Sequence, residues 1–272
     1  MIGAIIGDIV GSRFEHSRMK SKDFEFFTKD SKITDDTICT LACTDWMSND
    51  QSIDPEVVLR YWCQKYFHIG GWGARFHEWI CNQSKGPYNS CGNGSAMRCS
   101  PIAVYGDIIG PQTMERLVDK FTNITHNHPE SIRAVRLYTK MIAHCYTPFG
   151  TNIADLWKML MDEYGDDLRE RYDVVTVDCI RKSYKYTELV QLTFPEAMVC
   201  VLDGKDFQDS IRNAVSLGGD ADTLACIAGG LAEALYGIPE EFIGEAMDRL
   251  DRFQKRTICD LYTSTGRKIK LV

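Results

Sequence analysis

The sequence lacks the long apolar run, of about eighteen residues, that a membrane-spanning helix needs. Its first twelve residues are apolar, but they carry no basic leader and are interrupted by Asp8 and Gly11, which argues against a secretory signal. Basic residues are also in the minority, since 31 Lys and Arg face 38 Asp and Glu and the formal net charge is −7. Nucleic acids and membrane surfaces attract basic patches. We therefore expect neither as a partner.

The cysteines form no recognisable framework, although there are eleven of them. No two stand in a C-x-x-C arrangement, and the spacing of cysteines and histidines does not match a zinc site. An odd number of scattered cysteines indicates reduced thiols, most of them inside the protein. We expect a cytoplasmic protein without disulfides.

Strand-like alternation is scarce, and its best example, residues 174–177, can equally begin a helix. With 272 residues and 44% hydrophobic composition, the chain has enough apolar material for one large core. Most of it follows the helical period, with proline near the start of three helices, at Pro55, Pro111 and Pro129. Other helices are expected over 95–105, 152–164, 195–202, 206–217, 223–236 and 239–254. We predict an all-α fold with one compact domain over 1–272.

Two polar clusters, far apart in the sequence, each precede a helical apolar pattern. The first is Thr34-Asp35-Asp36-Thr37, and the second is Gly218-Gly219-Asp220-Ala221-Asp222-Thr223. Asp and Thr at a helix start can simply cap free N–H groups. Two groups of carboxylates exceed that need, and hard oxygen donors without His or Cys suit Mg²⁺, Mn²⁺ or Ca²⁺. Spacing alone leaves paired caps and a metal site equally open.

A glycine loop, Gly92-Asn93-Gly94-Ser95, leads into the helix expected over 95–105. It is not a Walker loop, because the Lys-Ser/Thr ending is missing. Its backbone N–H groups can form a nest for a diphosphate, or the segment can be an ordinary tight turn. A histidine pair follows at His126 and His128, and Pro129 places Asn127 or His128 at a helix cap.

Taken in order, these segments resemble the ADP-ribosylglycohydrolase family, which includes the dinitrogenase-reductase-activating glycohydrolases. The matching motifs run to about Gly237 and so cover nearly the whole chain. They are Gly7-Asp8-x-x-Gly11-Ser12-x-x-Glu15, Thr34-Asp35-Asp36-Thr37, Gly92-Asn93-Gly94-Ser95-Ala96-Met97-Arg98, Thr125-His126 and Gly218-Gly219-Asp220-x-Asp222-Thr223.

The resemblance implies an orthogonal helical bundle with two Mg²⁺ or Mn²⁺ ions at the base of an ADP-ribose cleft. It implies metal ligands at both helix starts, namely Thr34, Asp35, Asp36, Asp220, Asp222 and Thr223. By the same resemblance, the amides of Gly92, Asn93, Gly94 and Ser95 wrap the diphosphate. His126 contacts ADP-ribose, and Glu15 approaches the substrate ribose.

The activity implied is hydrolysis of the bond between C1″ of ADP-ribose and a modified residue, with release of ADP-ribose. Glu15 or Asp36 serves as base or leaving-group acid. Arginine is our first choice of modified residue, by analogy with bacterial members, and ADP-ribosyl-serine and O-acetyl-ADP-ribose are the alternatives. A two-metal nucleotide phosphohydrolase and a non-catalytic ADP-ribose-binding member represent other classes.

The stretch between Glu15 and the first acidic cluster, residues 16–33, is rich in charge. It can be a solvated loop or a mobile flap that covers the cleft. We interpret it as a flap, because it joins two elements of the expected site.

Overall fold

The structure is a computed structural model that describes residues 1–49, 51–147 and 151–269. Within these ranges every regular element is a helix, which confirms the all-α prediction, and one isolated antiparallel bridge joins Gly92 to Leu189. In chain order the elements are α1 (Ile2–Gly11), α2 (Asp35–Ser48), α3 (Pro55–Lys65), η1 (Phe67–Ile69), α4 (Ala74–Cys81), α5 (Gly94–Met97), α6 (Ser100–Val104), α7 (Gly106–Ile109), α8 (Pro111–Thr122), α9 (Pro129–Cys145), α10 (Ile153–Arg171), α11 (Val177–Ser183), η2 (Val190–Leu192), α12 (Phe194–Leu202), α13 (Phe207–Val215), α14 (Ala221–Tyr236), α15 (Glu240–Asp248) and α16 (Arg252–Ser264).

The first helix and the fourteenth pack against each other at the centre of the bundle, although they come from opposite ends of the chain. Every residue of α1 is buried. A Cβ atom on Gly7 would overlap the backbone oxygen of Ala225, and one on Gly229 would overlap that of Gly3. Glycine therefore lets the two backbones touch, and this contact brings the N-terminal ends of the site elements together.

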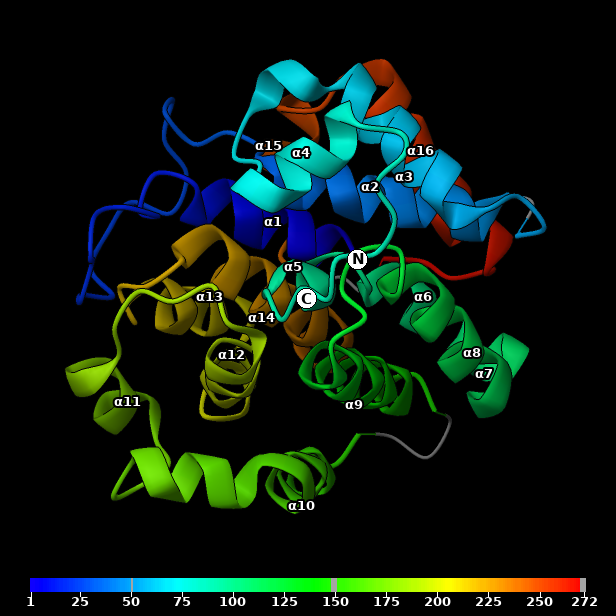
Figure 1. Cartoon of the computed structure of the whole chain (residues 1–272). Helices are drawn as coiled ribbons and strands as arrows, with labels where there is room; N and C mark the ends of the chain where they lie inside the picture. The colour runs from blue at the N-terminus through cyan, green and yellow to red at the C-terminus, as the bar shows by residue number, and fades with distance from the viewer. Residues whose placement is uncertain (50, 148–150, 270–272) are drawn as a thin grey trace.

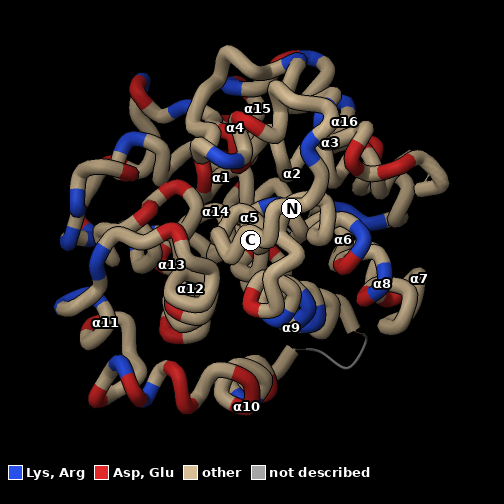
Figure 2. The backbone as a smooth tube through the Cα atoms, in the orientation of Figure 1, with Lys and Arg blue, Asp and Glu red and all other residues tan. Residues whose placement is uncertain are grey.

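The remaining helices surround this central pair (Figure 1). In that view α2, α3, α4 and α16 lie above α1, whereas α9, α12 and α13 lie below, and α10 and α11 form an outer layer. Figure 2 shows that Lys and Arg alternate with Asp and Glu along α10 and α11, which is typical of a solvated face. None of the helices in the described ranges is both long and apolar enough to cross a membrane.

Several helix boundaries follow the expected capping chemistry. Asp54 accepts a hydrogen bond from the N–H of Glu56 in front of Pro55, and His128 does the same for Glu130 in front of Pro129. At the other end of α14, Gly237 has the positive φ of 86° that favours glycine at a helix end.

Two predicted helices were wrong in their extent. The helix expected over 95–105 divides into α5 and α6, because Pro101 has no N–H and cannot continue a helix. The helix expected over 239–254 ends at Asp248, and a new one starts where Asp251 and Gln254 form a reciprocal capping box. For residues 174–177 the structure has the second of the two alternatives: they form no strand, and Thr176 caps the start of α11.

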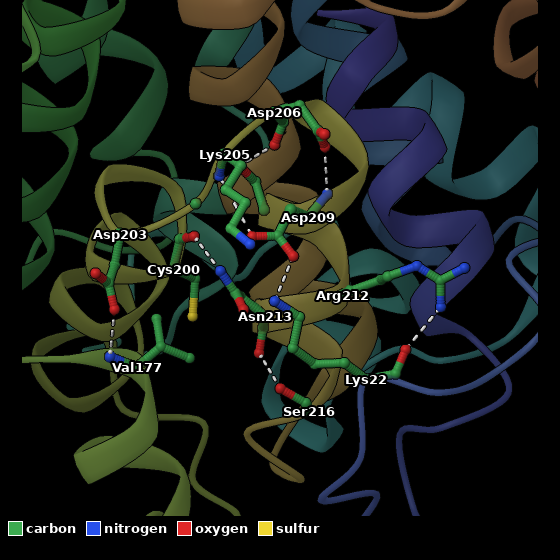
Figure 3. Close-up of polar contacts among 12 residues, drawn as sticks. Lys22, Val177, Cys200, Asp203, Lys205, Asp206, Asp209, Arg212, Asn213 and Ser216 are labelled. Atoms are coloured by element: carbon green, nitrogen blue, oxygen red, sulfur yellow. Dashed lines mark hydrogen bonds and ion pairs between the residues drawn. The ribbon is translucent and has the colours of Figure 1, made fainter.

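The segment over residues 16–33 is fastened to the bundle and is not a flap over the cleft. Figure 3 shows Lys22 paired with Asp209 of α13 and the guanidinium of Arg212 donating to the backbone oxygen of Lys22. Arg212 also donates to the backbone oxygen of Phe24, and both distances are 2.7 Å. Lys20 donates to the backbone oxygens of Arg181 (2.9 Å) and Tyr184 (2.7 Å) at the end of α11. No residue of this segment lines the cleft described below.

Candidate functional site

A cleft opens where the N-terminal ends of α2, α5 and α14 converge. Its volume is about 310 Å³, at the lower end of the range, roughly 300–1,000 Å³, that small-molecule sites occupy. The lining includes members of both acidic clusters, of the glycine loop and of the histidine motif. Predicted site residues in the lining are Glu15, Asp35, Asp36, Gly92, Asn93, Gly94, His126, Asp220, Asp222 and Thr223.

Thr34 is the N-cap of α2, and its side chain accepts a hydrogen bond from the N–H of Asp36. Its own donors go to Asp8 of α1, which accepts the Thr34 N–H at 2.9 Å and the Thr34 hydroxyl at 2.7 Å. Asp8 also accepts the N–H of Thr37 at 3.1 Å and the Thr37 hydroxyl. A carboxylate offers about four lone-pair positions. Asp8 thus accepts three hydrogen bonds at Oδ2 and one at Oδ1, and it anchors the start of α2 from the neighbouring helix.

The carboxylates of the two clusters meet in the floor of the cleft. One oxygen each from Asp8, Asp36 and Asp222 lie within 4.8 Å of one another, and so do oxygens from Glu15, Asp220 and Asp222. Asp222 belongs to both groups. The hydroxyl of Thr223 donates to Asp36 at 3.3 Å, so the start of α14 is tied directly to the start of α2.

This arrangement fits divalent cations. Asp36 is 2% exposed, and its Oδ1 atom is buried without a hydrogen-bond partner. Burial and the neighbouring carboxylates raise the pKa values of Asp35, Asp36 and Asp222 well above their usual range. Ionised oxygens packed this closely need positive charge between them, and an all-oxygen donor set is the set that Mg²⁺ and Mn²⁺ prefer.

The glycine loop uses most of its amides within the protein. The N–H of Asn93 donates to the backbone oxygen of Glu188 at 2.7 Å, and that of Gly92 donates to the hydroxyl of Ser90 at 3.2 Å. The N–H of Ser95 points back to Gly92 at 3.4 Å. Among the described residues, no partner is seen for the N–H of Gly94. The Asn93 side chain also donates to Asp220 at 2.7 Å, which links the loop to the acidic floor.

The structure separates the two histidines. His126 is 5% exposed and lines the cleft, whereas His128 caps α9. Burial and the nearby cations of Arg98 and Arg75 lower the pKa of His126 well below its usual value. His126 is therefore a neutral ring that a ligand in the cleft can meet.

Some lining residues carried no recognisable signal in the sequence. Tyr186 and Glu188 come from an irregular segment before η2, which the bridge between Gly92 and Leu189 holds beside the glycine loop. Arg75 at the opposite wall follows no motif. Asp8 was within reach of sequence reasoning, because it belongs to the Gly-Asp motif of α1, but its hydrogen bonds depend on the packing of two helices.

Several known proteins are similar to this chain. A family model described as ADP-ribosylglycohydrolase matches residues 1–268. ADP-ribosyl-[dinitrogen reductase] glycohydrolase of Rhodospirillum rubrum is 25% identical over 97% of this chain and 95% of its own. ADP-ribosylarginine hydrolase Tri1 of Pseudomonas putida is 25% identical over 89% of this chain and 72% of its own, and Crystallin J1B of Tripedalia cystophora is 26% identical over 56% and 49%. A solved structure titled ADP-ribosylglycohydrolase-related protein complex has the same fold, with a TM-score of 0.71 at 21% identity and coverage of 97% of this chain and 95% of that one.

Proposed function

This chain belongs to the ADP-ribosylglycohydrolase family, whose members hydrolyse glycosidic bonds, and from that premise we propose that it releases ADP-ribose from ADP-ribosylated arginine in a metal-dependent reaction. The observation that carries the proposal is the convergence of two acidic clusters, 184 or more residues apart, in the floor of one cleft. ADP-ribose, free or attached to a protein or small molecule, is the partner that we expect. The free thiols of the eleven cysteines, all within the described ranges, are consistent with a cytoplasmic location.

The metal ligands that we propose come from the two helix starts. They are Thr34, Asp35, Asp36, Asp220, Asp222 and Thr223, and they hold two divalent cations, Mg²⁺ or Mn²⁺. When bound, such ions polarise substrate oxygens and stabilise charge that develops at the sugar. The hydroxyl hydrogen of Thr34 points to Asp8, so an oxygen lone pair of Thr34 remains for a cation.

Substrate binding rests on the opposite part of the cleft. We assign the diphosphate to the loop of Gly92, Asn93, Gly94 and Ser95, where the N–H of Gly94 is available, and a further contact to His126. The Asn93 side chain donates a hydrogen bond to Asp220 and so joins the loop to the acidic floor. This geometry supports a ribose next to the carboxylates, because the diphosphate and the sugar are adjacent in ADP-ribose.

Proton transfer falls to Glu15 or Asp36. Glu15 is partly exposed and lines the cleft, and burial together with nearby Asp220 and Glu188 raises its pKa. A carboxyl group with a raised pKa exchanges a proton more readily near neutral pH. Glu15 can therefore remove a proton from the attacking water or deliver one to the leaving group, and Asp36 is the second candidate for either role.

The choice of arginine is supported by the acidic character of one cleft wall. Tyr186 donates a hydrogen bond to Glu188 at 3.0 Å, and Glu188 and Glu15 both line this wall. A guanidinium leaving group is a planar cation that pairs well with carboxylates. The leaving groups of ADP-ribosyl-serine and O-acetyl-ADP-ribose carry no positive charge, and neither gains from this wall.

A panel of three substrates tests the proposal. Purified protein is incubated with ADP-ribosyl-arginine, ADP-ribosyl-serine and O-acetyl-ADP-ribose, in Mg²⁺, in Mn²⁺ and in EDTA, and free ADP-ribose is measured. We expect the fastest release from the arginine substrate and none in EDTA. Faster release from another substrate would reassign the specificity. Phosphate release would indicate a nucleotide phosphohydrolase, and binding of ADP-ribose without turnover would indicate a non-catalytic member.

A further inference from the structure

Arg98 is a buried cation without a carboxylate partner. It follows α5 directly, its side chain is 1% exposed, and no ion pair links it to an acidic residue of the described ranges. Its Nε atom has no hydrogen-bond partner, and its guanidinium lies 5.8 Å from the ring centroid of Phe76 and 5.5 Å from that of Phe121. Burying an unpaired charge is expensive, so the location of Arg98 calls for a functional explanation.

The polar contacts of Arg98 point toward one wall of the cleft. Its Nη2 atom donates to the hydroxyl oxygen of Thr125 at 2.8 Å and lies 3.4 Å from Nδ1 of His126. The hydroxyl oxygen of Thr125 is 2.7 Å from the same Nδ1 atom. Thr125 is completely buried, so these distances belong to a closed group of three side chains.

One assignment of donors and acceptors satisfies all three contacts of this group. A guanidinium donates and never accepts, so the Thr125 oxygen receives its hydrogen bond from Arg98. The hydroxyl hydrogen of Thr125 is then free to point to Nδ1 of His126. In this assignment Nδ1 accepts from both neighbours, and the single ring proton is on Nε2.

We propose that Arg98, acting through the Thr125 hydroxyl, holds His126 in the neutral tautomer that carries its proton on Nε2. This makes Arg98 and Thr125 positioning residues for His126. The Nε2 atom faces the glycine loop: it lies 3.3 Å from the place where a Cβ of Gly94 would stand and 3.4 Å from that of Gly92. The ring thus offers the cleft one fixed N–H donor, which suits an anionic oxygen such as that of a diphosphate.

The surroundings of the ring favour its neutral form. The charged groups nearest to His126 are Arg98 and Arg75, both cations, and the ring of Tyr88 is 6.2 Å away between centroids. A second positive charge in this position is disfavoured by burial and by both arginines. The donor on Nε2 is therefore present across the neutral pH range and does not depend on protonation.

Nitrogen-15 NMR of the ring tests the tautomer in the full chain without ligand. The His126 signals are assigned by their loss in His126→Gln. The expected result is a pyrrole-type shift for Nε2 and a pyridine-type shift for Nδ1 at pH 7. A pyrrole-type shift for Nδ1, a doubly protonated ring or a mixture of tautomers would overturn the proposal.

Two variants test the role of the neighbours. Thr125→Val keeps the shape of the side chain but removes the hydroxyl, and Thr125→Ser is the matched control that keeps it. Arg98→Met removes the cation. If that variant does not fold, the comparison of Thr125→Val with Thr125→Ser tests the proposal by itself. We expect both tautomers of His126 in Thr125→Val and in folded Arg98→Met, and only the wild-type one in Thr125→Ser. Finding only the wild-type tautomer of His126 in Thr125→Val, or in folded Arg98→Met, would overturn the proposal.

A binding measurement connects the tautomer to the cleft, and this arm rests on the proposed function. ADP-ribose should bind about twofold more weakly to Thr125→Val than to the wild type, because a ring shared between two tautomers presents the Nε2 donor only about half of the time. Thr125→Ser should bind like the wild type. If Thr125→Val and Thr125→Ser differ in the tautomer of His126 but bind ADP-ribose with equal affinity, the tautomer has no role in binding ADP-ribose. If the wild type binds no ADP-ribose, the proposed function fails while the NMR result stands.

Discussion

Asp8 of α1 holds Thr34 at the start of α2 by two hydrogen bonds, from the backbone N–H at 2.9 Å and from the hydroxyl at 2.7 Å. Because the hydroxyl hydrogen points to Asp8, the remaining lone pairs of the Thr34 oxygen face away from it. The central helix α1 therefore positions candidate metal ligands at the start of α2, although α1 itself carries neither of the two acidic clusters.

The first prediction concerns Asp8→Asn, which replaces one acceptor by a donor and frees the Thr34 hydroxyl to rotate. We expect the affinity for Mn²⁺ to fall by about 10- to 100-fold, the usual effect of losing a group that orients a metal ligand. Isothermal titration calorimetry measures it. Asp203→Asn is a suitable control, since Asp203 also accepts a backbone N–H at a helix start, that of Val177 at 3.0 Å, but lies elsewhere. Unchanged affinity in Asp8→Asn would contradict the anchoring role.

The second prediction concerns pH and metal removal. Burial raises the pKa of Asp8 to about 6, and burial with neighbouring carboxylates raises those of Asp36 and Asp222 well above their usual range. Such groups bind more protons in the folded than in the unfolded state, so the metal-free protein should lose stability as pH rises from about 4 through 6 and beyond. Thermal unfolding in EDTA should show this decline. Mn²⁺ should remove most of it, and a pH profile that is the same with and without Mn²⁺ would count against a metal at these carboxylates.

The third prediction concerns the contact between α1 and α14. Gly7→Ala places a Cβ where the backbone oxygen of Ala225 lies, and neither backbone can yield without moving its helix. We expect a loss of about 3 kcal/mol in the free energy of unfolding, since overpacking a core typically costs 1–3 kcal/mol and this clash involves backbone. Gly244→Ala is the matched control, because nothing lies within 4 Å of its added Cβ. It should leave the stability unchanged or raise it slightly, and equal effects of the two substitutions would refute the close backbone contact.

The fourth prediction separates proton transfer from metal binding. Glu15→Gln keeps the shape of the side chain and removes its ability to exchange a proton. Turnover should fall by about 10²- to 10⁴-fold, the usual contribution of a general acid or base. Mn²⁺ affinity, measured by titration, should change far less, because Asp36 and Asp222 remain. A turnover close to that of the wild type would leave Asp36 as the candidate for proton transfer.

Much of the helical architecture is predictable from local signals. Asp54 and His128 cap helix starts with their side chains, and Gly237 ends a helix with a positive φ. These residue types favour such positions, so the sequence alone predicts these helix ends. The broken helices were missed although their signals were present: Pro101 interrupts one and Asp251 starts another. Apolar periodicity runs through such breaks, so the apolar pattern alone does not reveal them.

The site was less predictable than the fold. Spacing could not distinguish paired caps from a metal site at Asp36 and Asp222, and family resemblance favoured the latter. Their proximity depends on the glycine contact between α1 and α14, which joins residues more than 200 positions apart. The position of Glu188 depends on an irregular segment without periodicity, and the anchored course of residues 16–33 depends on side chains such as Arg212 in a distant helix.

The most direct test of the account compares the wild type with Asp36→Ala and Asp222→Ala. Each is assayed for Mn²⁺ binding and for release of ADP-ribose from ADP-ribosyl-arginine, with the exposed Asp166→Ala as control. The account predicts metal binding and metal-dependent release by the wild type and the control, and the loss of both in the two cluster variants. Retention of metal binding and hydrolysis by either cluster variant, or hydrolysis by the wild type in EDTA, would contradict it.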